Sequence, residues 1–284
     1  MRIIITGSSG FIGQSIEKHF SKDNIIMKLK IRKDVNFHEL ENKILSFQPE
    51  IFIHCGWDGG NSFSDIDNSN QLTNVEVGIR ILKTISKIKN LYFIGLGSFS
   101  EYGNLTEPAT EKTPEHPSSL YGLSKYMFKQ ISESMCTYSC QKWLWVRPCY
   151  VYGPNDVKTR LIPKVIDSLL DDKEIVLDSC DTVVDYIYIE DFVSALHELI
   201  KECATGCYNI CSGQQYSIKD VVLSIKQKIK KGNILFDSSI DRKKFQKYIC
   251  GSNEKLLKKT SWHQQYEINK GIEKTIYFTK QDKK

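Results

Sequence analysis

The chain has 284 residues, a formal net charge of +5 and 40% hydrophobic residues. This composition allows a packed core and excludes global disorder, and the length suits one large α/β domain or a nucleotide domain with a smaller companion. No apolar run approaches the roughly 20 residues that a membrane helix needs, so we expect no membrane partner. Because the apolar stretch from Ile3 to Thr6 is too short for a secretory signal, we expect a cytoplasmic protein.

The positive charge comes from lysines spread along the chain, a pattern typical of a solvated surface. A basic stripe with interleaved aromatics, or a recognised nucleic-acid module, is missing, so we predict no nucleic-acid partner. The nine cysteines are scattered and lack the Cys-x-x-Cys pairs of zinc sites. We therefore predict reduced thiols and no metal.

Strand and helix patterns alternate through the first half of the chain. In chain order, we predict a strand at 2–6, a helix at 12–20, a strand at 24–32, a helix at 39–47, a strand at 51–57, a helix at 75–88, a strand at 91–98, a helix at 118–136 and a strand at 143–148. This alternation predicts an α/β fold with a doubly wound, parallel, Rossmann-type sheet.

The pattern changes after residue 154. We predict helices at 161–170, 192–201 and 218–229 and short strands at 174–178, 185–189 and 207–210, whereas the last fifty residues are Lys-rich and less periodic. We therefore predict a dinucleotide-binding domain over residues 1–154 and a smaller C-terminal α/β substrate-binding lobe over 155–284. Within that lobe, about 185–211 is expected to return to the sheet.

A glycine-rich turn, "TGSSGFIG", joins the first strand to the first helix. Gly7 suits unusual backbone angles in the turn, Gly10 leaves room for a pyrophosphate, and Gly13 allows close packing of helix on sheet. The N-terminus of the helix adds backbone N–H groups and the positive end of its dipole. We therefore predict a dinucleotide site here, to which Ser9, Phe11 and Ile12 also contribute.

The three-three spacing of these glycines resembles the extended branch of the short-chain dehydrogenase/reductase superfamily, the NAD-dependent epimerase/dehydratase family. The segments "PEIFIHCGW", "VRPCYVYGP", "VVDYIYIEDFVSAL", "CYNICSG" and "SWHQQYEINKGIEKTI" are similar to later family signatures, in order. The resemblance covers essentially the whole chain. It implies further cofactor contacts at Asp34, His54, Cys55, Gly56, Asn74 and Pro148.

The choice of nicotinamide cofactor depends on the end of the second strand, where an NAD enzyme typically has an acid. This region reads "MKLKIRKD" and is crowded with basic residues instead. A cationic fork suits a 2′-phosphate, so we predict NADPH, held first by Arg32 and second by Lys30. NADH is the alternative.

A Tyr-x-x-x-Lys spacing occurs at Tyr121 and Lys125, where it puts both residues on one face of a helix. The same spacing recurs at 138–142 and 266–270, so the spacing alone does not identify a site. The resemblance selects Tyr121 and Lys125, because this family carries its Tyr and Lys on the helix after the fifth strand. It also selects Ser98, four residues before the Tyr-Gly pair at 102–103.

The resemblance implies a role for each member of this triad. Lys125 would bind the nicotinamide ribose and lower the pKa of Tyr121, which would act as general acid. Ser98 would polarise the substrate carbonyl.

Nucleotide-sugar dehydratases of this family carry Thr-Asp-Glu where this chain has Ser98, Phe99 and Ser100. Glu101 is one residue late, and we expect it to point elsewhere on an extended segment. Dehydration is therefore disfavoured. The basic cluster and the length favour NADPH-dependent reduction of a nucleotide-linked 4-keto-6-deoxysugar to the 4-hydroxy sugar, in the synthesis of bacterial surface polysaccharide precursors; the position of the ketone rests on family analogy.

The substrate side departs from the family, because Val184 replaces the arginine that commonly binds the diphosphate. Candidates to hold the expected nucleotide-diphosphate sugar are Ser100, Tyr150, Arg160, Lys164 and Arg242. The resemblance also implies a homodimer formed through the helices that carry Val77 and Lys125. Two alternatives stay open: an epimerase with tightly bound NAD, and a non-catalytic dinucleotide-binding sensor or interaction protein.

Overall fold

The computed structural model of the protein describes residues 1–30, 36–59, 69–240 and 246–283. The chain divides into two compact units. Unit 1 comprises Met1–Gly103, Pro114–Pro148 and Leu196–Tyr208, and unit 2 comprises Asn104–Thr113, Cys149–Ala195 and Asn209–Lys284.

A six-stranded sheet forms the centre of unit 1. Its strands are β1 (Arg2–Thr6), β2 (Ile25–Leu29), β3 (Ile51–His54), β4 (Tyr92–Leu96), β5 (Lys142–Pro148) and β10 (Gly206–Ile210), the last two residues of which belong to unit 2. They follow the order β10-β5-β4-β3-β1-β2, and the pairs from β5 to β2 are all parallel. Strands β1, β3 and β4 are almost entirely buried, which is typical of parallel strands covered on both faces.

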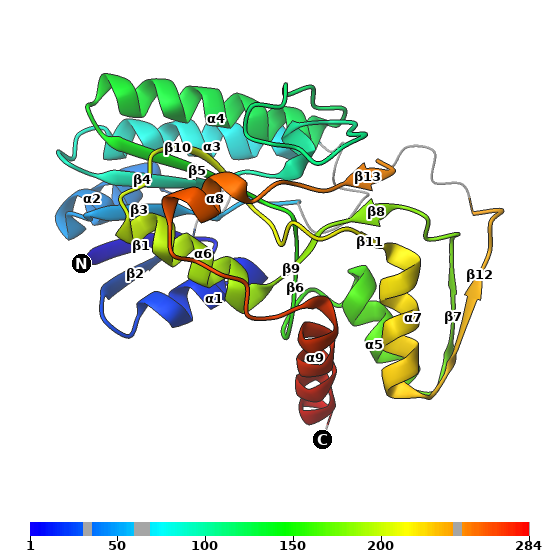
Figure 1. The fold of residues 1–284 in the computed structure, drawn as a ribbon. Coiled ribbons are helices and arrows are strands. Elements are labelled where there is room, and N and C mark those ends of the chain that lie inside the picture. Colours follow the sequence, from blue (N-terminus) through cyan, green and yellow to red (C-terminus); the bar gives the residue numbers. More distant parts are fainter. Residues whose placement is uncertain (31–35, 60–68, 241–245, 284) are drawn as a thin grey trace. The chain divides into compact units, whose positions relative to one another are not determined.

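Four helices join consecutive strands of this sheet: α1 (Phe11–Phe20), α2 (Phe37–Phe47), α3 (Asn70–Ile85) and α4 (Leu120–Tyr138). Helices α2, α3 and α4 bury Ile44, Ile81 and Phe128 in one core cluster with Phe52 and Phe93 of the sheet. Figure 1 shows α3 and α4 on one face of the sheet and α1 on the opposite face. The sheet is therefore doubly wound.

The order of the strands reverses next to β1. The chain passes from β1 through α1 to β2 on one side, and then through α2 to β3 on the other side of β1. In open α/β sheets, ligands bind at the carboxyl ends of the strands at this reversal. The fold therefore directs attention to the segments that follow Thr6 and His54.

Unit 2 consists of short strands and helices. Its strands are β6 (Tyr150–Tyr152), β7 (Glu174–Leu177), β8 (Val183–Val184), β9 (Tyr186–Tyr188), β11 (Tyr216–Ser217), β12 (Asn233–Phe236) and β13 (Tyr248–Ile249); its helices are α5 (Leu161–Leu170), the first half of α6 (Ile189–Lys201), α7 (Ile218–Ile229), α8 (Glu254–Lys259) and α9 (Ile268–Asp282). The strands form the small sheets β11-β8-β13, β12-β7 and β6-β9. Helix α7 packs on α5 and α9 and buries Val222 and Ile225.

A buried carboxylate holds one turn of unit 2 in place. Asp185, which is fully buried, accepts hydrogen bonds from the backbone N–H groups of Ser212 and Gly213 and from the Ser212 hydroxyl, all at 2.8–2.9 Å. Burial raises the pKa of Asp185 to about 6 against the opposing effect of these donors. Asp185, the neighbour of Val184, thus uses its carboxylate for hydrogen bonds within unit 2.

The predicted α/β fold, with a doubly wound parallel sheet and a smaller C-terminal lobe, is confirmed. Several details differ from the prediction: β2 ends at Leu29 and β3 at His54, α3 begins at Asn70 rather than at 75 and α6 at Ile189 rather than at 192, and α8, α9 and several short strands of unit 2 were not predicted. Within the described part of the chain, no helix has both the length and the apolar character needed to cross a membrane.

Candidate active site

The glycine turn lies at the carboxyl end of β1. Gly7 has φ +67°, and a Cβ there would lie 2.6 Å from the backbone nitrogen of Gly56, so only glycine fits. A Cβ at Gly13 would lie 2.1 Å from the Gly7 carbonyl oxygen. A Cβ at Gly10 would meet only that same oxygen, at 3.4 Å, so the other space around Gly10 is open. The backbone angle at Gly7 and the close packing at Gly13 are as expected, and that the space beside Gly10 takes a pyrophosphate stays a prediction.

Helix α1 begins at this turn, and its N-terminus has no side-chain cap from Gly10. Its cap residue is Gly10, which has no side chain to accept the N–H groups of the first turn. The helix then starts with Phe11, Ile12 and Gly13, and Ser9 is exposed beside it. Uncapped N–H groups at the positive end of a helix dipole, next to open space, fit the diphosphate of a dinucleotide.

The end of β3 and the residues after it contact the end of β1, where the glycine turn begins. The Thr6 hydroxyl accepts the N–H of Gly56 (2.9 Å) and shares a hydrogen bond with Nδ1 of His54 (3.0 Å). His54 is buried against Phe128, and burial lowers its pKa to about 3, so the ring is neutral. Burial also raises the pKa of Cys55 to about 12, which keeps this thiol protonated. His54 therefore acts as structural support, whereas the backbone at 55–56 faces the turn.

Asn74 holds the loop after β3 with both ends of its side-chain amide. Its side-chain oxygen accepts the N–H of Asp58 at 2.9 Å, and its side-chain nitrogen donates to the Asp58 carbonyl at 2.8 Å. Both ends of the amide are thus used to hold the loop after β3. A contact between Asn74 and the cofactor stays a prediction.

The residues predicted to select the cofactor are only partly described. Lys30 is exposed directly after β2, and Pro148 is half-buried as the last residue of β5. Arg32 and Asp34 lie outside the described residues.

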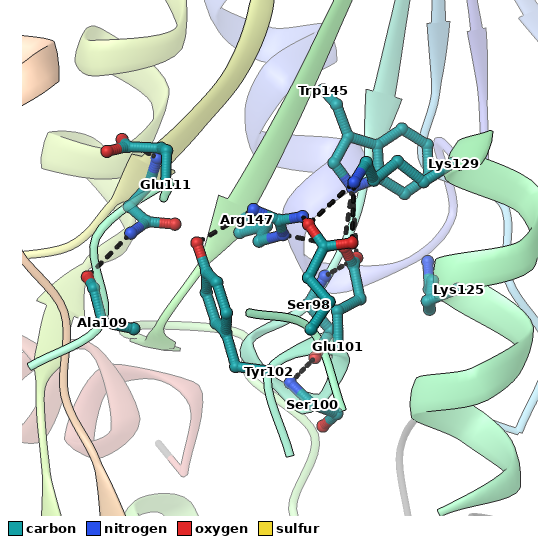
Figure 2. A network of polar contacts seen from close by, with 12 residues as sticks. Ser98, Ser100, Glu101, Tyr102, Ala109, Glu111, Lys125, Lys129, Trp145 and Arg147 are labelled. Atoms are coloured by element: carbon teal, nitrogen blue, oxygen red, sulfur yellow. Dashed lines mark hydrogen bonds and ion pairs between the residues drawn. The ribbon is translucent and has the colours of Figure 1, made fainter. Parts of the chain in front are cut away.

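Ser98 lies two residues beyond β4, at the same carboxyl edge of the sheet as the glycine turn. It caps a short 3-10 helix, η2 (Phe99–Glu101), and its hydroxyl oxygen accepts the N–H of Ser100 at 3.1 Å (Figure 2). In return, the Glu101 side chain accepts the backbone N–H of Ser98 at 2.8 Å. The expectation of an extended segment was wrong, because these two reciprocal bonds favour a helical turn. Glu101 does point away, into the protein interior.

Tyr121 and Lys125 occupy the first turns of α4, which packs against η2. Lys125 Nζ donates to the carbonyl oxygen of Leu96 at 2.8 Å and lies 5.9 Å from the centre of the Tyr121 ring. A Cβ at Gly122 would lie 2.3 Å from the Ser100 carbonyl oxygen, so helix and turn are in close contact. The structure thus gathers Ser98, Tyr121 and Lys125 at one edge of the sheet.

Lys125 is buried, and burial lowers the pKa of its ammonium group to about 7, against the opposing charge of Glu101. The ammonium lies 4.0 Å from the centre of the Trp57 ring, in cation–π geometry. The indole N–H of Trp57 donates to Gln71 at 2.7 Å, which fixes the ring. Sequence reasoning missed Trp57; its position at the end of the "IFIHCGW" segment was the available signal.

The two other Tyr-x-x-x-Lys pairs have different surroundings. Tyr138 is the last residue of α4 and is 92% exposed, whereas Lys142 already belongs to β5. Tyr266 precedes α9 in unit 2, and Lys270 lies over its ring at 4.9 Å.

The predicted substrate residues fall in both units. Ser100 belongs to η2 in unit 1, and Tyr150, Arg160 and Lys164 belong to unit 2. Arg160 pairs with the buried carboxylate of Asp156 at 3.4 Å. Arg242 lies outside the described residues. That these side chains meet around one substrate stays a prediction.

A parallel, doubly wound sheet with a glycine turn at its reversal point defines a dinucleotide-binding α/β protein. Within that class, the model of the NAD dependent epimerase/dehydratase family matches residues 3–211, and the chain belongs to this family.

Three known proteins illustrate the similarity. The dTDP-6-deoxy-L-talose 4-dehydrogenase (NAD(+)) of Aggregatibacter actinomycetemcomitans is 25% identical, over 78% of this chain and 88% of its own. The CDP-abequose synthase of Salmonella muenchen is 24% identical over 97% of both chains. The crystal structure of UDP-glucose 4-epimerase from Thermotoga maritima, with UDP-glucose, shares the fold at a TM-score of 0.89, with 18% identity and full coverage of both chains.

Proposed function

We propose that the protein catalyses the NADPH-dependent reduction of a nucleotide-linked 4-keto-6-deoxysugar to the 4-hydroxy sugar. The main support for this proposal is the segment 99–101, which follows Ser98. Phe99 is buried with its ring packed on Tyr102, and Ser100 follows it, so neither position supplies an acid. Glu101 is buried in an ion pair with Arg147. Positions 99 and 100 therefore lack the carboxylates that dehydration of a sugar requires. The residues proposed to reduce a carbonyl, Ser98, Tyr121 and Lys125, are present.

The relatives add support at the level of reaction chemistry. The name of the talose 4-dehydrogenase describes interconversion of an alcohol and a ketone at position 4 of a nucleotide-linked 6-deoxysugar. Read in the reducing direction, that chemistry is the one proposed here. The CDP-abequose synthase, which matches almost the whole chain, is likewise named for a nucleotide-linked sugar.

The mechanism follows from the positions of three side chains. A bound nicotinamide dinucleotide supplies the hydride. The Ser98 oxygen already accepts the Ser100 N–H, so its own hydrogen is available to donate to the ketone oxygen. Tyr121 supplies a proton to the same oxygen, and the ammonium of Lys125 favours the phenolate that this transfer leaves behind.

The function is tested with a panel of nucleotide-linked 4-keto-6-deoxysugars that differ in the base, with loss of NADPH absorbance as the readout. We expect one or more members to be reduced and a 4-hydroxy product to form in equal amount. If the purified protein instead holds NAD tightly and interconverts sugar epimers without consuming NADPH, it is an epimerase and the proposal is wrong.

Cofactor preference is tested at Lys30, the exposed cation at the end of β2. A lysine bound to the 2′-phosphate predicts that Lys30→Ala weakens NADPH binding about 10-fold or more and leaves NADH binding unchanged. Lys89 is the matched control, because it is exposed just before β4, at the amino edge of the sheet. Titration by fluorescence measures both affinities. Equal losses for Lys30→Ala and Lys89→Ala, or for both cofactors, would contradict the assignment.

A further inference from the structure

The carboxylate of Glu101 is fully buried and accepts hydrogen bonds on both oxygens. Oε1 accepts the backbone N–H of Ser98 at 2.8 Å, and Oε2 accepts Nε of Arg147 at 2.7 Å. The indole N–H of Trp145 lies 3.1 Å from each oxygen. Figure 2 shows this arrangement, with Glu101 between Ser98 and Arg147. The carboxylate thus joins the backbone of Ser98 to the interior of unit 1.

The same residue closes a reciprocal cap around Ser98. Ser98 accepts the Ser100 N–H through its side chain, while its own N–H is held by Glu101. Two bonds in opposite directions fix both the backbone and the side-chain rotamer. Gly97 makes room for this arrangement, because a Cβ there would lie 2.2 Å from Oε1 of Glu101.

The interaction continues from Glu101 to helix α4. Arg147 is fully buried and also bonds the Tyr102 hydroxyl (2.9 Å) and the carboxylate of Glu115. Glu115 in turn pairs with Lys129 of α4 at 2.7 Å. A continuous set of ion pairs therefore links the turn that carries Ser98 to the helix that carries Tyr121 and Lys125.

Stability alone explains this arrangement poorly. Replacing a buried ion pair by apolar residues of similar volume is often neutral or stabilising. A reacting group displaced by about 1 Å, by contrast, can lose about 100-fold in rate. Precise placement of the Ser98 hydroxyl is the function that the geometry of Glu101 serves directly.

We propose that Glu101 is a positioning residue that fixes the Ser98 hydroxyl for donation to the ketone oxygen of the substrate. This inference rests on the proposed reduction, in which Ser98 contacts that oxygen. Glu101 itself touches neither substrate nor cofactor in this account.

Comparison of Glu101→Gln with Glu115→Gln separates this role from the loss of an ion pair with Arg147. The amide has one accepting oxygen, so it cannot serve both donors, and the buried Arg147 charge attracts that oxygen. The amide NH₂ group then faces the Ser98 N–H, which loses its acceptor. Glu115→Gln is the matched control, because it also removes a carboxylate from Arg147 but has no contact with Ser98.

A double-mutant cycle on kcat tests the proposal, with NADPH and the best keto sugar of the panel. We expect Glu101→Gln to lower kcat about 10- to 100-fold in the wild-type background and less than about 3-fold in the Ser98→Ala background. Glu115→Gln should change kcat by less than about 3-fold in either background. Multiplicative losses for Glu101→Gln and Ser98→Ala, or an equal loss for Glu115→Gln, would overturn the proposal.

Hydrogen exchange provides a readout that does not depend on activity. We expect the amide of Ser98 to exchange faster in Glu101→Gln than in wild type and at the wild-type rate in Glu115→Gln. Unchanged exchange in Glu101→Gln contradicts the proposal. If wild type reduces no keto sugar while Ser98 exchange still depends on Glu101, the proposed reaction fails and the positioning contact stands. Should Glu101→Gln not fold, Glu101→Asp is used, since it keeps the charge but retreats from the Ser98 N–H.

Discussion

The burial of Lys125 predicts how the proposed reductase activity depends on pH. Burial lowers the pKa of Lys125 to about 7, while the charge of the Glu101 carboxylate opposes that shift; the neutral thiol of Cys55, the neutral ring of His54 and the phenol of Tyr121 also lie beside it. An ammonium is charged below its pKa and neutral above it. The proposed catalytic role of Lys125 requires the charged form.

We therefore expect kcat/KM to fall as the pH rises through about 7, with a slope that approaches −1, because kcat/KM reports groups of the free enzyme. Initial rates across pH with a reducible keto sugar measure this. Lys125→Met should have a low rate without this titration. A wild-type profile that is flat from pH 6 to about 9 would contradict the assigned role of the ammonium.

At the scale of elements, the contact between α4 and η2 sets the geometry of the site. Gly122→Ala removes a glycine from a helix, which on propensity alone stabilises a protein by about 1 kcal/mol. Here the new Cβ would lie 2.3 Å from the Ser100 carbonyl oxygen, so the helix and the turn must separate. We expect destabilisation of about 1–3 kcal/mol and a loss of kcat, because Tyr121 moves with the helix.

Thermal unfolding and initial rates check this prediction, with Leu123→Ala as the control. Leu123 is the neighbouring residue of α4 and is 41% exposed, so its truncation should change both quantities little. A Gly122→Ala variant that is more stable than wild type, with normal kcat, would show that the contact is unimportant.

Elements with strong periodicity were predictable from the sequence. The apolar strand predicted at 51–57 is present at Ile51–His54, three residues shorter, and the amphipathic helix predicted at 161–170 is present at Leu161–Leu170. Helix α9 was missed although Ile268, Ile272 and Ile276 recur every four residues, because the lysines among them obscured the pattern. The 3-10 helix at 99–101 was missed because one turn has no period to detect, although Ser98 and Glu101 form a capping box.

At the scale of the whole molecule, topology was predictable because alternating strands and helices permit few arrangements. The position of the glycine turn and the triad at one edge of the sheet follows from that topology. The buried ion pairs did not follow, because Glu101 and Arg147 are 46 residues apart and meet only in the folded chain. A charged residue inside the apolar run "WLWVRP" was the available signal, since a buried charge requires a partner.

The central claim is that Tyr121 donates a proton to a sugar ketone, and the chain contains its own control. Tyr138 has the same spacing to a lysine but is exposed at the end of α4. With the reducible keto sugar and NADPH, we expect Tyr121→Phe to lower kcat about 100-fold or more without weakening NADPH binding, and Tyr138→Phe to retain wild-type turnover. Undiminished turnover by Tyr121→Phe, with NADPH bound normally, would contradict the account.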